Sequence, residues 1–417
     1  MYGTLAISPR SLREYEAVVL PDTLAALHRL AKPLRGLRVL NLSITAFGTG
    51  VADLLGASVP LLSDLGLHCQ WQVVRAAEEF RAVNKELYMA LSGRHVAWSH
   101  EMADVWRRFS AMNADLMTED FDVVVVHDPQ PAGIRSFVEE ARRSRTRWVM
   151  YCHLDISSAQ EEVWFLLREH LADYDAIVFE SPAFLRSDMG LANVTIVRPA
   201  IDPLGPRNMD LSEEAVSAIL ARYGIDRARP LVCQVSPMDE SCDPLGAIDV
   251  YYRARQQVSG LQLALVATTV PEDPAGRACF EEAARKSLEY SDVCFLSSLN
   301  EVGNVEINVF QRAASLTMQR DLRRGFGLWL ADALWKERPV VAARRGALPE
   351  QVIDGRTGFL AEGEQQFAER VVQLLQDPGL AAEMGRAGKQ HVAENFLITR
   401  YLADTLQLLG RLVGAGA

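Results

Sequence analysis

Short apolar runs that alternate with stretches of helical periodicity are the feature that most limits the fold of this chain. In the first half such runs occur at 37–43, 69–74, 121–126, 148–152, 176–179 and 194–197, and helical patterns such as 78–91 and 161–171 separate most of them. Apolar strands that are buried on both faces and joined by helices are typical of a mostly parallel sheet. The first half therefore predicts an α/β domain with a doubly wound, Rossmann-like sheet.

A second series of the same kind follows in the other half of the chain. Strands are predicted at 231–235, 263–267, 293–296, 314–318, 339–343 and 357–360, and periodic helices end the chain at 364–376, 380–395 and 399–412. Prolines and a glycine concentrate between the two series, at 198–206, where neither a helix nor a central strand can continue. Because 417 residues suit two domains, we place the domain boundary at this stretch.

Charge and cysteine usage exclude some classes of partner. The formal net charge of −11 argues against a nucleic-acid partner, which would normally meet a basic face. The six cysteines form no C-x-x-C pair, which indicates a reducing compartment. The first residues lack a basic and then apolar leader, and no apolar run is long enough to cross a bilayer. We expect a cytoplasmic protein with no membrane partner and no metal site.

A glycine-containing turn follows the first predicted strand and begins a helix. Glycines let the backbone approach a ligand, and the amides at a helix start favour anionic oxygens. Spacing alone leaves a plain tight turn equally open, because the full G-x-G-x-x-G pattern is not present. The candidate ligand-binding residues of this turn are Gly48, Thr49, Gly50 and Val51.

Two loops with a histidine and an aspartate follow the predicted strands at 121–126 and 148–152. The first carries His127 and Asp128, and the second carries His153 and Asp155. Ligands of doubly wound sheets bind outside the carboxyl ends of the strands, so two such loops favour a binding site. The structural alternatives are an aspartate that caps a backbone amide and a histidine satisfied within the fold.

Two glycine-rich turns follow neighbouring strands of the second domain and open helices. The first contains Arg324, Gly325, Phe326 and Gly327, with Asp332 in the helix that follows. The second contains Arg345 and Gly346. Amides at such helix starts can hold a phosphate or a sugar oxygen.

With these motifs, the chain resembles the retaining glycosyltransferases of family 4 and, within them, the trehalose glycosyltransferring synthases. The matching segments lie between about Leu37 and Leu409, at 47–52, 127–131, 152–157, 199–204, 234–236, 325–328, 333–340 and 354–360. The resemblance implies two Rossmann-like domains of the GT-B type around a cleft, with a C-terminal helix that crosses back. The expected domains are 1–205 with 396–417, and 206–395.

The resemblance also implies the substrates. The first domain would hold a sugar or sugar-like acceptor, and the second would hold the nucleotide of a nucleoside-diphosphate sugar. No cofactor or metal is expected beyond this donor substrate, and a homodimer is expected. His153 resembles the family histidine beside the transferred sugar, Asp128 is an acceptor-side candidate, and Ser236 belongs to a matching donor-side segment.

The chain departs from the family where the leaving diphosphate is normally bound. The family carries an Arg and a Lys after the segment that matches 234–236, whereas 236–246 has no cation and three acids here. Two family glutamates become Arg324 and Asp332, which we predict to bind the diphosphate and the ribose. Losing one preorganised cation costs roughly 3–4 kcal/mol in the transition state.

Three interpretations of this departure stay open. The positive charge is relocated to Arg324, with Arg323 or Arg345 as further candidates. Alternatively, the chain couples unusual substrates, such as a cyclitol or a modified sugar. In the third, it binds a ligand or a partner without turnover.

Overall fold

The computed structural model describes residues 3–237, 240–268, 274–320 and 326–414. It divides into two compact units: unit 1 is Met1–Ala200 with Ile398–Ala417, and unit 2 is Ile201–Leu397. The sequence-based boundaries assigned 201–205 and 396–397 to the first domain. The contacts within the structure group both pieces with unit 2 instead. The two pieces also pair with each other, since Ile201 and Leu397 form a parallel bridge and the Ile201 N–H donates to the Phe396 carbonyl at 2.8 Å.

Unit 1 contains a seven-stranded sheet in the order β1-β3-β2-β4-β5-β6-β7. Its strands are β1 (Gly3–Thr4), β2 (Arg38–Ser43), β3 (His68–Val73), β4 (Val123–His127), β5 (Arg147–Cys152), β6 (Ala176–Phe179) and β7 (Val194–Ile196). All pairs are parallel except β1 with β3. The predicted α/β, doubly wound class is confirmed, and the carboxyl ends of β2, β4, β5 and β6 lie along one edge.

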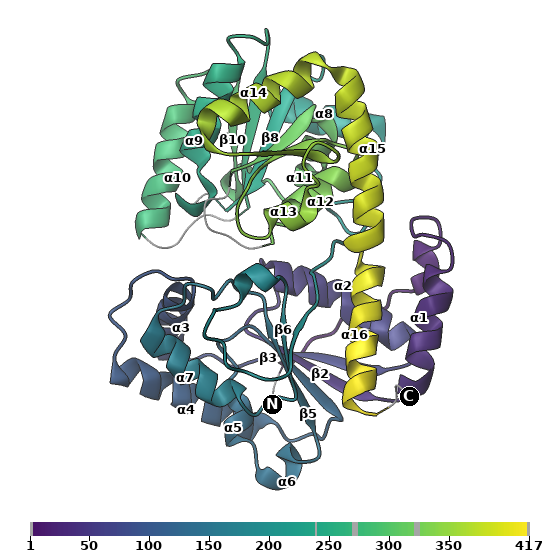
Figure 1. The fold of residues 1–417 in the computed structure, drawn as a ribbon, viewed down its shortest axis with the longest axis vertical. Coiled ribbons are helices and arrows are strands. Elements are labelled where there is room, and N and C mark those ends of the chain that lie inside the picture. Colours follow the sequence, from purple (N-terminus) through teal and green to yellow (C-terminus); the bar gives the residue numbers. More distant parts are fainter. Residues whose placement is uncertain (1–2, 238–239, 269–273, 321–325, 415–417) are drawn as a thin grey trace. The chain divides into compact units, whose positions relative to one another are not determined.

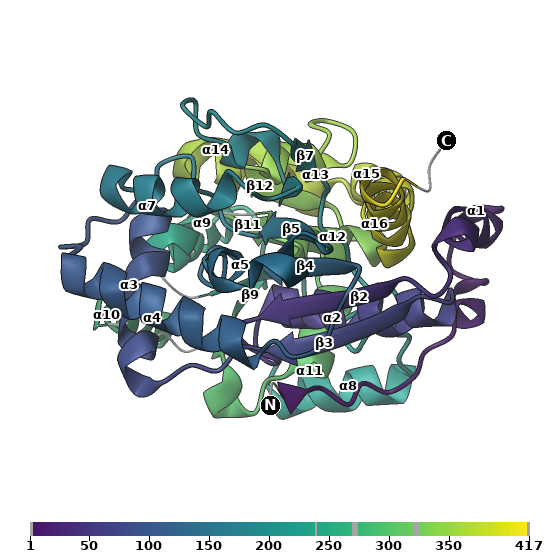
Figure 2. The same cartoon turned by 90° about the horizontal axis from the view of Figure 1, so that it is seen from below.

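Helices cover both faces of this sheet (Figures 1 and 2). They are α1 (Thr23–Ala31), α2 (Gly50–Asp64), α3 (Glu78–Leu91), α4 (His100–Leu116), α5 (Ile134–Phe137), α6 (Glu140–Arg143), α7 (Glu161–Leu171) and α16 (Ile398–Leu412), with 3₁₀ turns η1 (Leu12–Tyr15), η2 (Lys32–Leu34) and η3 (Pro182–Phe184). The C-terminal helix α16 packs against α1, α2 and η2, so the predicted return of the chain end to the first unit is observed. Among the residues that the structure describes, no helix is both long and apolar enough to cross a membrane.

Unit 2 contains a six-stranded parallel sheet in the order β10-β9-β8-β11-β12-β13. Its strands are β8 (Leu231–Ser236), β9 (Gln262–Ala267), β10 (Val293–Leu296), β11 (Leu316–Gln319), β12 (Val340–Ala343) and β13 (Gly358–Ala361). Its helices are α8 (Glu213–Arg222), α9 (Pro244–Ala254), α10 (Pro274–Ser287), α11 (Asn304–Ala313), α12 (Trp329–Trp335), α13 (Leu348–Gln351), α14 (Gly363–Gln376) and α15 (Pro378–Asn395), with turns η4 (Glu240–Cys242) and η5 (Ser298–Asn300). The order of the strands reverses between β8 and β11, which makes that point the switch point of the sheet.

Close packing in unit 2 depends on glycines at one helix contact. Helix α15 packs on α12, and a Cβ atom at Gly385 would lie only 2.1 Å from the carbonyl oxygen of Glu337. A Cβ atom at Gly388 would lie 2.5 Å from Leu334 Cδ2. Residues without a side chain are therefore required where the two helices meet.

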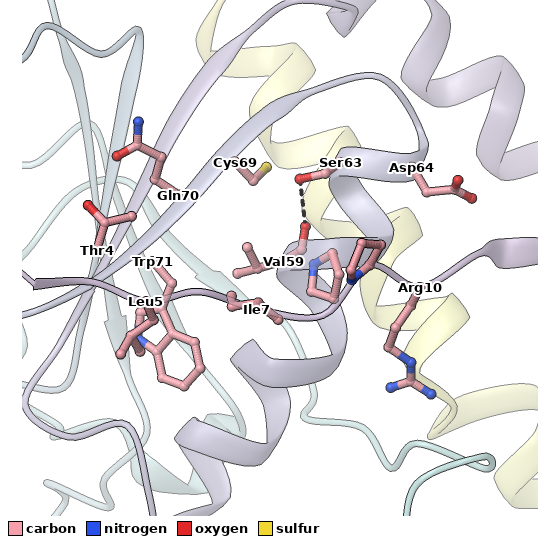
Figure 3. Close-up of a pocket in the computed structure, with 12 residues that line it drawn as sticks. Thr4, Leu5, Ile7, Arg10, Val59, Ser63, Asp64, Cys69, Gln70 and Trp71 are labelled. Atoms are coloured by element: carbon pink, nitrogen blue, oxygen red, sulfur yellow. Dashed lines mark hydrogen bonds between the residues drawn. The ribbon is translucent and has the colours of Figure 1, made fainter.

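A pocket of about 400 Å³ opens beside β3 in unit 1 (Figure 3). Its apolar lining includes Leu5 and Ile7 from the N-terminal segment, Val59 from α2 and Trp71 from β3. The indole N–H of Trp71 donates to the Ser43 hydroxyl at 2.7 Å and is thus satisfied inside the unit. The pocket lies along the middle of β3 and the second half of α2, away from the four strand ends described next.

Candidate functional site

Four neighbouring strands of unit 1 bring one buried polar side chain each to a continuous hydrogen-bonded chain. His127, the last residue of β4, places Nε2 3.1 Å from Asn41 Oδ1 of β2 and Nδ1 3.0 Å from His153 Nε2. His153 follows β5, and its Nδ1 lies 2.7 Å from Oε1 of Glu180, which follows β6. This four-residue chain, Asn41–His127–His153–Glu180, lies at the edge where a doubly wound sheet binds ligands.

The direction of these hydrogen bonds follows from the amide of Asn41. Its Nδ2 donates to the Gln70 carbonyl at 3.3 Å, so Oδ1 faces His127 and His127 Nε2 must donate. A neutral His127 then accepts at Nδ1 from His153 Nε2. One further proton is shared between His153 Nδ1 and the carboxylate of Glu180.

The electrostatics agree with this assignment. Burial, together with the charge of His153, lowers the pKa of His127 well below its usual value, so His127 is neutral. Burial also disfavours a charge on His153, but the hydrogen bond and the negative charge of Glu180 outweigh it and raise the pKa of His153. His153 is therefore the cationic member of the chain, held between a carboxylate and a neutral imidazole.

Asp128 lies beside this chain in a strained backbone conformation. Its φ is 72°, in the left-handed region that few residues other than glycine adopt, and its N–H donates to the Tyr151 carbonyl at 2.8 Å. Burial raises the pKa of Asp128, against the opposing charge of His153. Strained residues of this kind cluster at functional sites, and the acceptor-side role of Asp128 stays a prediction.

The predicted glycine turn is the exposed entrance to α2. Thr49 is the N-cap of that helix, and its hydroxyl accepts from the Ala52 N–H at 3.2 Å. Gly48 has φ 74°, so the turn requires glycine for its backbone although the space beside it is open. Phe47 precedes it with 82% of its surface exposed. The turn therefore presents backbone groups of Gly48 and Gly50 to solvent at the carboxyl end of β2.

In unit 2, the described part of the first glycine-rich turn differs from what its motif suggests. Arg324 and Gly325 lie outside the described residues, so their predicted roles stay predictions. The ring of Phe326 is buried and contacts Phe396, while its carbonyl accepts a hydrogen bond from Gln351. Gly327 has φ 59° at the entrance of α12. Phe326 thus serves packing within unit 2.

Asp332, predicted to bind a ribose, is turned into unit 2 instead. It is 1% exposed; its Oδ1 accepts from Asn208 Nδ2 at 2.7 Å, and Arg207 Nε lies 3.8 Å from its Oδ2. The geometry makes Asp332 an internal counter-ion. Its Oδ2 has no hydrogen-bond partner among the described residues, and the ribose contact stays a prediction. The sequence located the helix start but not the face of α12 that carries Asp332.

Lys336 completes this buried network. Its Nζ donates to Asn208 Oδ1 at 2.7 Å, to Gln311 Oε1 at 3.0 Å and to the Asp332 carbonyl at 2.9 Å. Burial lowers the pKa of Lys336 from 10.5 to about 7, and the charge of Asp332 offsets only part of this effect. The network thus joins α11, α12 and the segment that precedes α8.

The remaining predicted donor-side residues end two strands of unit 2. Ser236 closes β8 and is fully buried, and its hydroxyl has no hydrogen-bond partner among the described residues. Arg345 and Gly346 are exposed after β12, and Gly346 has φ 53°. All three therefore lie at carboxyl ends of the unit 2 strands, as predicted from their positions in the sequence.

No motif pointed to Asn41 or Glu180. Asn41 lies inside an apolar run and looks like an interruption of it, and Glu180 follows Phe179 without a neighbouring histidine. Glu180 does obey the rule that was applied to Asp128 and His153, since it directly follows a buried strand. That rule, applied to β6, would have found it.

Solved structures share the whole architecture. An α,α-trehalose-phosphate synthase (UDP-forming) from Burkholderia xenovorans, in complex with glucose-6-phosphate, superposes with a TM-score of 0.73 at 14% identity and covers 89% of this chain and 99% of that one. A sucrose-phosphate synthase from Thermosynechococcus elongatus gives a TM-score of 0.66 at 16% identity, with 91% and 100% of the two chains covered. At these identities the likeness establishes the fold alone.

Family models and relatives add the family. Residues 41–186 match the trehalose synthase N-terminal domain, and residues 247–377 match the glycosyl transferases group 1. The trehalose synthase of Rubrobacter xylanophilus is 38% identical over 97% of this chain and 98% of its own, and that of Thermococcus litoralis is 35% identical over 96% and 97%. Fold and matches together define a glycosyltransferase of the GT-B type. More narrowly, the chain belongs to the trehalose synthase family, which confirms the resemblance found in its motifs.

Proposed function

We propose that this protein is a retaining glycosyltransferase that moves a sugar from a nucleoside-diphosphate sugar to a sugar-like acceptor. The observation that carries the proposal is the four-residue chain at the carboxyl edge of unit 1, in a protein 38% identical to a trehalose synthase. Because the relatives are named for trehalose, glucose is the first acceptor to test. The cytoplasmic location and the homodimer stay predictions.

The unit 1 residues divide the work by their charge and position. His153 supplies a fixed positive charge beside the transferred sugar, while His127 and Glu180 accept from its two N–H groups and so orient the ring. Asp128, whose pKa burial raises, is a stronger base than an ordinary carboxylate and accepts a hydrogen bond from an acceptor hydroxyl other than the attacking one. The exposed turn with Gly48 and Gly50 offers backbone amides to phosphate oxygens.

The unit 2 residues hold the nucleotide. The switch point between β8 and β11 is where doubly wound sheets bind nucleotides. Ser236, Gly327 and the Arg345–Gly346 turn lie at strand ends or a helix start of this sheet. Arg324, outside the described residues, is retained as a candidate ligand of the diphosphate.

The reaction is a displacement on one face of the sugar. The bond from the anomeric carbon to the phosphate oxygen breaks, and the bond to the acceptor oxygen forms on the same face. The proton of the acceptor hydroxyl passes to the departing diphosphate. Stabilisation of the leaving group supplies most of the catalysis in this scheme.

A second candidate function is supported by the stretch 236–246, which has no cation. Pro237 follows β8, and Cys242 is buried with its carbonyl accepting from Gln234 Nε2 at 3.0 Å. Such a loop suits a member that couples cyclitol-like substrates, or one that binds nucleotides or sugars without turnover.

One pair of measurements separates these functions. Titration calorimetry with UDP, ADP and GDP tests nucleotide binding, and radiolabelled nucleoside-diphosphate glucoses with glucose or a cyclitol as acceptor test turnover. A labelled disaccharide supports the transferase, and a labelled cyclitol conjugate supports the first alternative. Nucleotide binding with the donor left intact supports the binding protein. Binding of no nucleotide refutes the proposed function.

A further inference from the structure

The switch point of unit 2 contains a cation that no motif identified. Arg320 directly follows β11, and Ser236 ends the neighbouring strand β8. The two strands pair in parallel with Leu316 opposite Val232 and Thr317 opposite Cys233. Continuing this register brings Arg320 opposite Ser236, at the edge where a nucleotide would bind.

The guanidinium of Arg320 is fixed in orientation but only partly used. Its Nε and Nη2 both donate to Asp243 Oδ2, the former at 2.8 Å, and its Cζ lies 4.7 Å from the centre of the Phe367 ring. The side chain is 7% exposed, and within the described residues Nη1 has no hydrogen-bond partner. Asp243 thus holds Nε and Nη2 of the guanidinium, while the third nitrogen, Nη1, donates to no described residue.

Asp243 ties this guanidinium to the start of α9. It is the N-cap of that helix, and its Oδ1 accepts from the Gly246 N–H at 3.0 Å. A Cβ atom at Gly246 would lie 2.3 Å from Asp243 Oδ2 and 2.7 Å from Arg320 Nη2, so a glycine is needed for the approach. The carboxylate therefore lies where an anion binds to a helix N-terminus, with a guanidinium beside it.

We propose that Arg320 binds a phosphate oxygen of a nucleoside diphosphate through Nη1, and that Asp243 is its positioning residue. This inference rests on the proposed function. The stretch 236–246 has no cation, and Arg320 supplies one directly after the neighbouring strand β11. Ser236, whose buried hydroxyl has no hydrogen-bond partner among the described residues, is the second donor at this edge. A guanidinium suits the task because its planar fork can hold one carboxylate and still offer donors to a phosphate.

The test compares two variants that differ only at Arg320. The first variant is Asp243→Asn, in which asparagine is still a good helix cap. The second is the double variant Asp243→Asn with Arg320→Gln, which leaves no Asp243 carboxylate without its arginine partner. Titration calorimetry with UDP, ADP, GDP and inorganic pyrophosphate is expected to show a loss of affinity of about ten- to a hundredfold from the single to the double variant. Equal affinities would overturn the assignment of Arg320.

Controls separate loss of a contact from loss of the fold. The matching nucleosides carry no phosphate, so the single and double variants should bind them with the same affinity. If nucleoside affinity falls as much as diphosphate affinity in the double variant, the result counts against the proposal. Arg253 lies on α9, the helix that Asp243 caps, and forms an exposed ion pair with Glu364 of α14; Arg253→Gln removes this pair and should leave the diphosphate affinity unchanged. If the double variant does not fold, Arg320→Lys serves instead. The single ammonium of the introduced lysine is engaged by Asp243, so no donor remains for a phosphate oxygen. Unchanged diphosphate affinity in this variant would refute the proposal.

The outcomes for the two proposals are distinct. Binding of pyrophosphate without any preference for nucleotides indicates a general phosphate site, and the same loss in the double variant then assigns Arg320 to it. If the wild type binds neither nucleoside diphosphates nor pyrophosphate, the proposed function and this inference both fail. If the wild type binds the diphosphates and the double variant binds as tightly as Asp243→Asn, only the role of Arg320 fails.

Discussion

Replacing Lys336 by Met tests the buried network of unit 2 through its pH dependence. Lys336 is 8% exposed, and burial lowers its pKa from 10.5 to about 7. In the unfolded chain the amine stays protonated up to its ordinary pKa. Unfolding therefore takes up a proton between pH 7 and 10.5, so the free energy of unfolding rises with pH in that window. The stability gained in this way is lost again as the pH falls to about 7.

The expected magnitude follows from the shift. Each pH unit in the window changes the free energy of unfolding by about 1.4 kcal/mol, so the step from pH 7 to 9 is worth about 2–3 kcal/mol. Methionine has a similar length and cannot titrate. The difference in stability between wild type and Lys336→Met should therefore grow by that amount over the same step, above a constant loss from the acceptors left on Asn208 and Gln311.

Urea denaturation at pH 7, 8 and 9, followed by circular dichroism, measures this difference. The matched control is Lys389→Met, which removes a half-exposed amine that pairs with Glu337 and lies over the Trp335 ring. For the control, the difference from wild type should not vary with pH. A constant difference for Lys336→Met across the three pH values would refute the assignment of a depressed pKa to Lys336.

Two further predictions concern the four-residue chain of unit 1 and the packing of α15 on α12. Glu180→Gln keeps a hydrogen bond to His153 but removes the negative charge that raises the pKa of His153. The rate of sugar transfer should therefore fall about tenfold near neutral pH, and the pH optimum of transfer should move to lower pH. Profiles of kcat and KM against pH check this, and an unmoved optimum would mean that Glu180 does not hold the positive charge on His153. Gly385→Ala places a Cβ atom against the Glu337 carbonyl and should cost about 1–3 kcal/mol, measured as a lower thermal midpoint, whereas Gly224→Ala would strain a turn through its φ of 69° without any such contact.

The strands could be predicted because both sheets are parallel and buried on both faces, which makes each strand a compact apolar run. The run at 176–179 coincides with β6, and that at 293–296 with β10. The sequence up to about Pro33 has a helical pattern with polar breaks, but this stretch holds β1, η1 and α1 with other segments between them. Prolines at 9 and 21 interrupt the helical pattern there.

The sites were predicted less completely because side-chain direction is a tertiary property. The edge of unit 1 followed from His153 and Asp128, since strand ends are visible in the sequence. The direction of Asp332 was not visible, because it depends on Asn208, which lies far away in the chain. Arg320 belongs to no motif of the sequence, and its pairing with Asp243 comes from the fold.

The place of α16 has a consequence for biosynthesis. Its residues Tyr401 and Leu402 are buried in unit 1, and Tyr401 contacts Tyr151 at the end of β5, two positions before His153. In the chain, α16 follows the whole of unit 2. Unit 2 is therefore synthesised whole while unit 1 still lacks α16, and a nascent chain that stops before residue 398 has an incomplete unit 1.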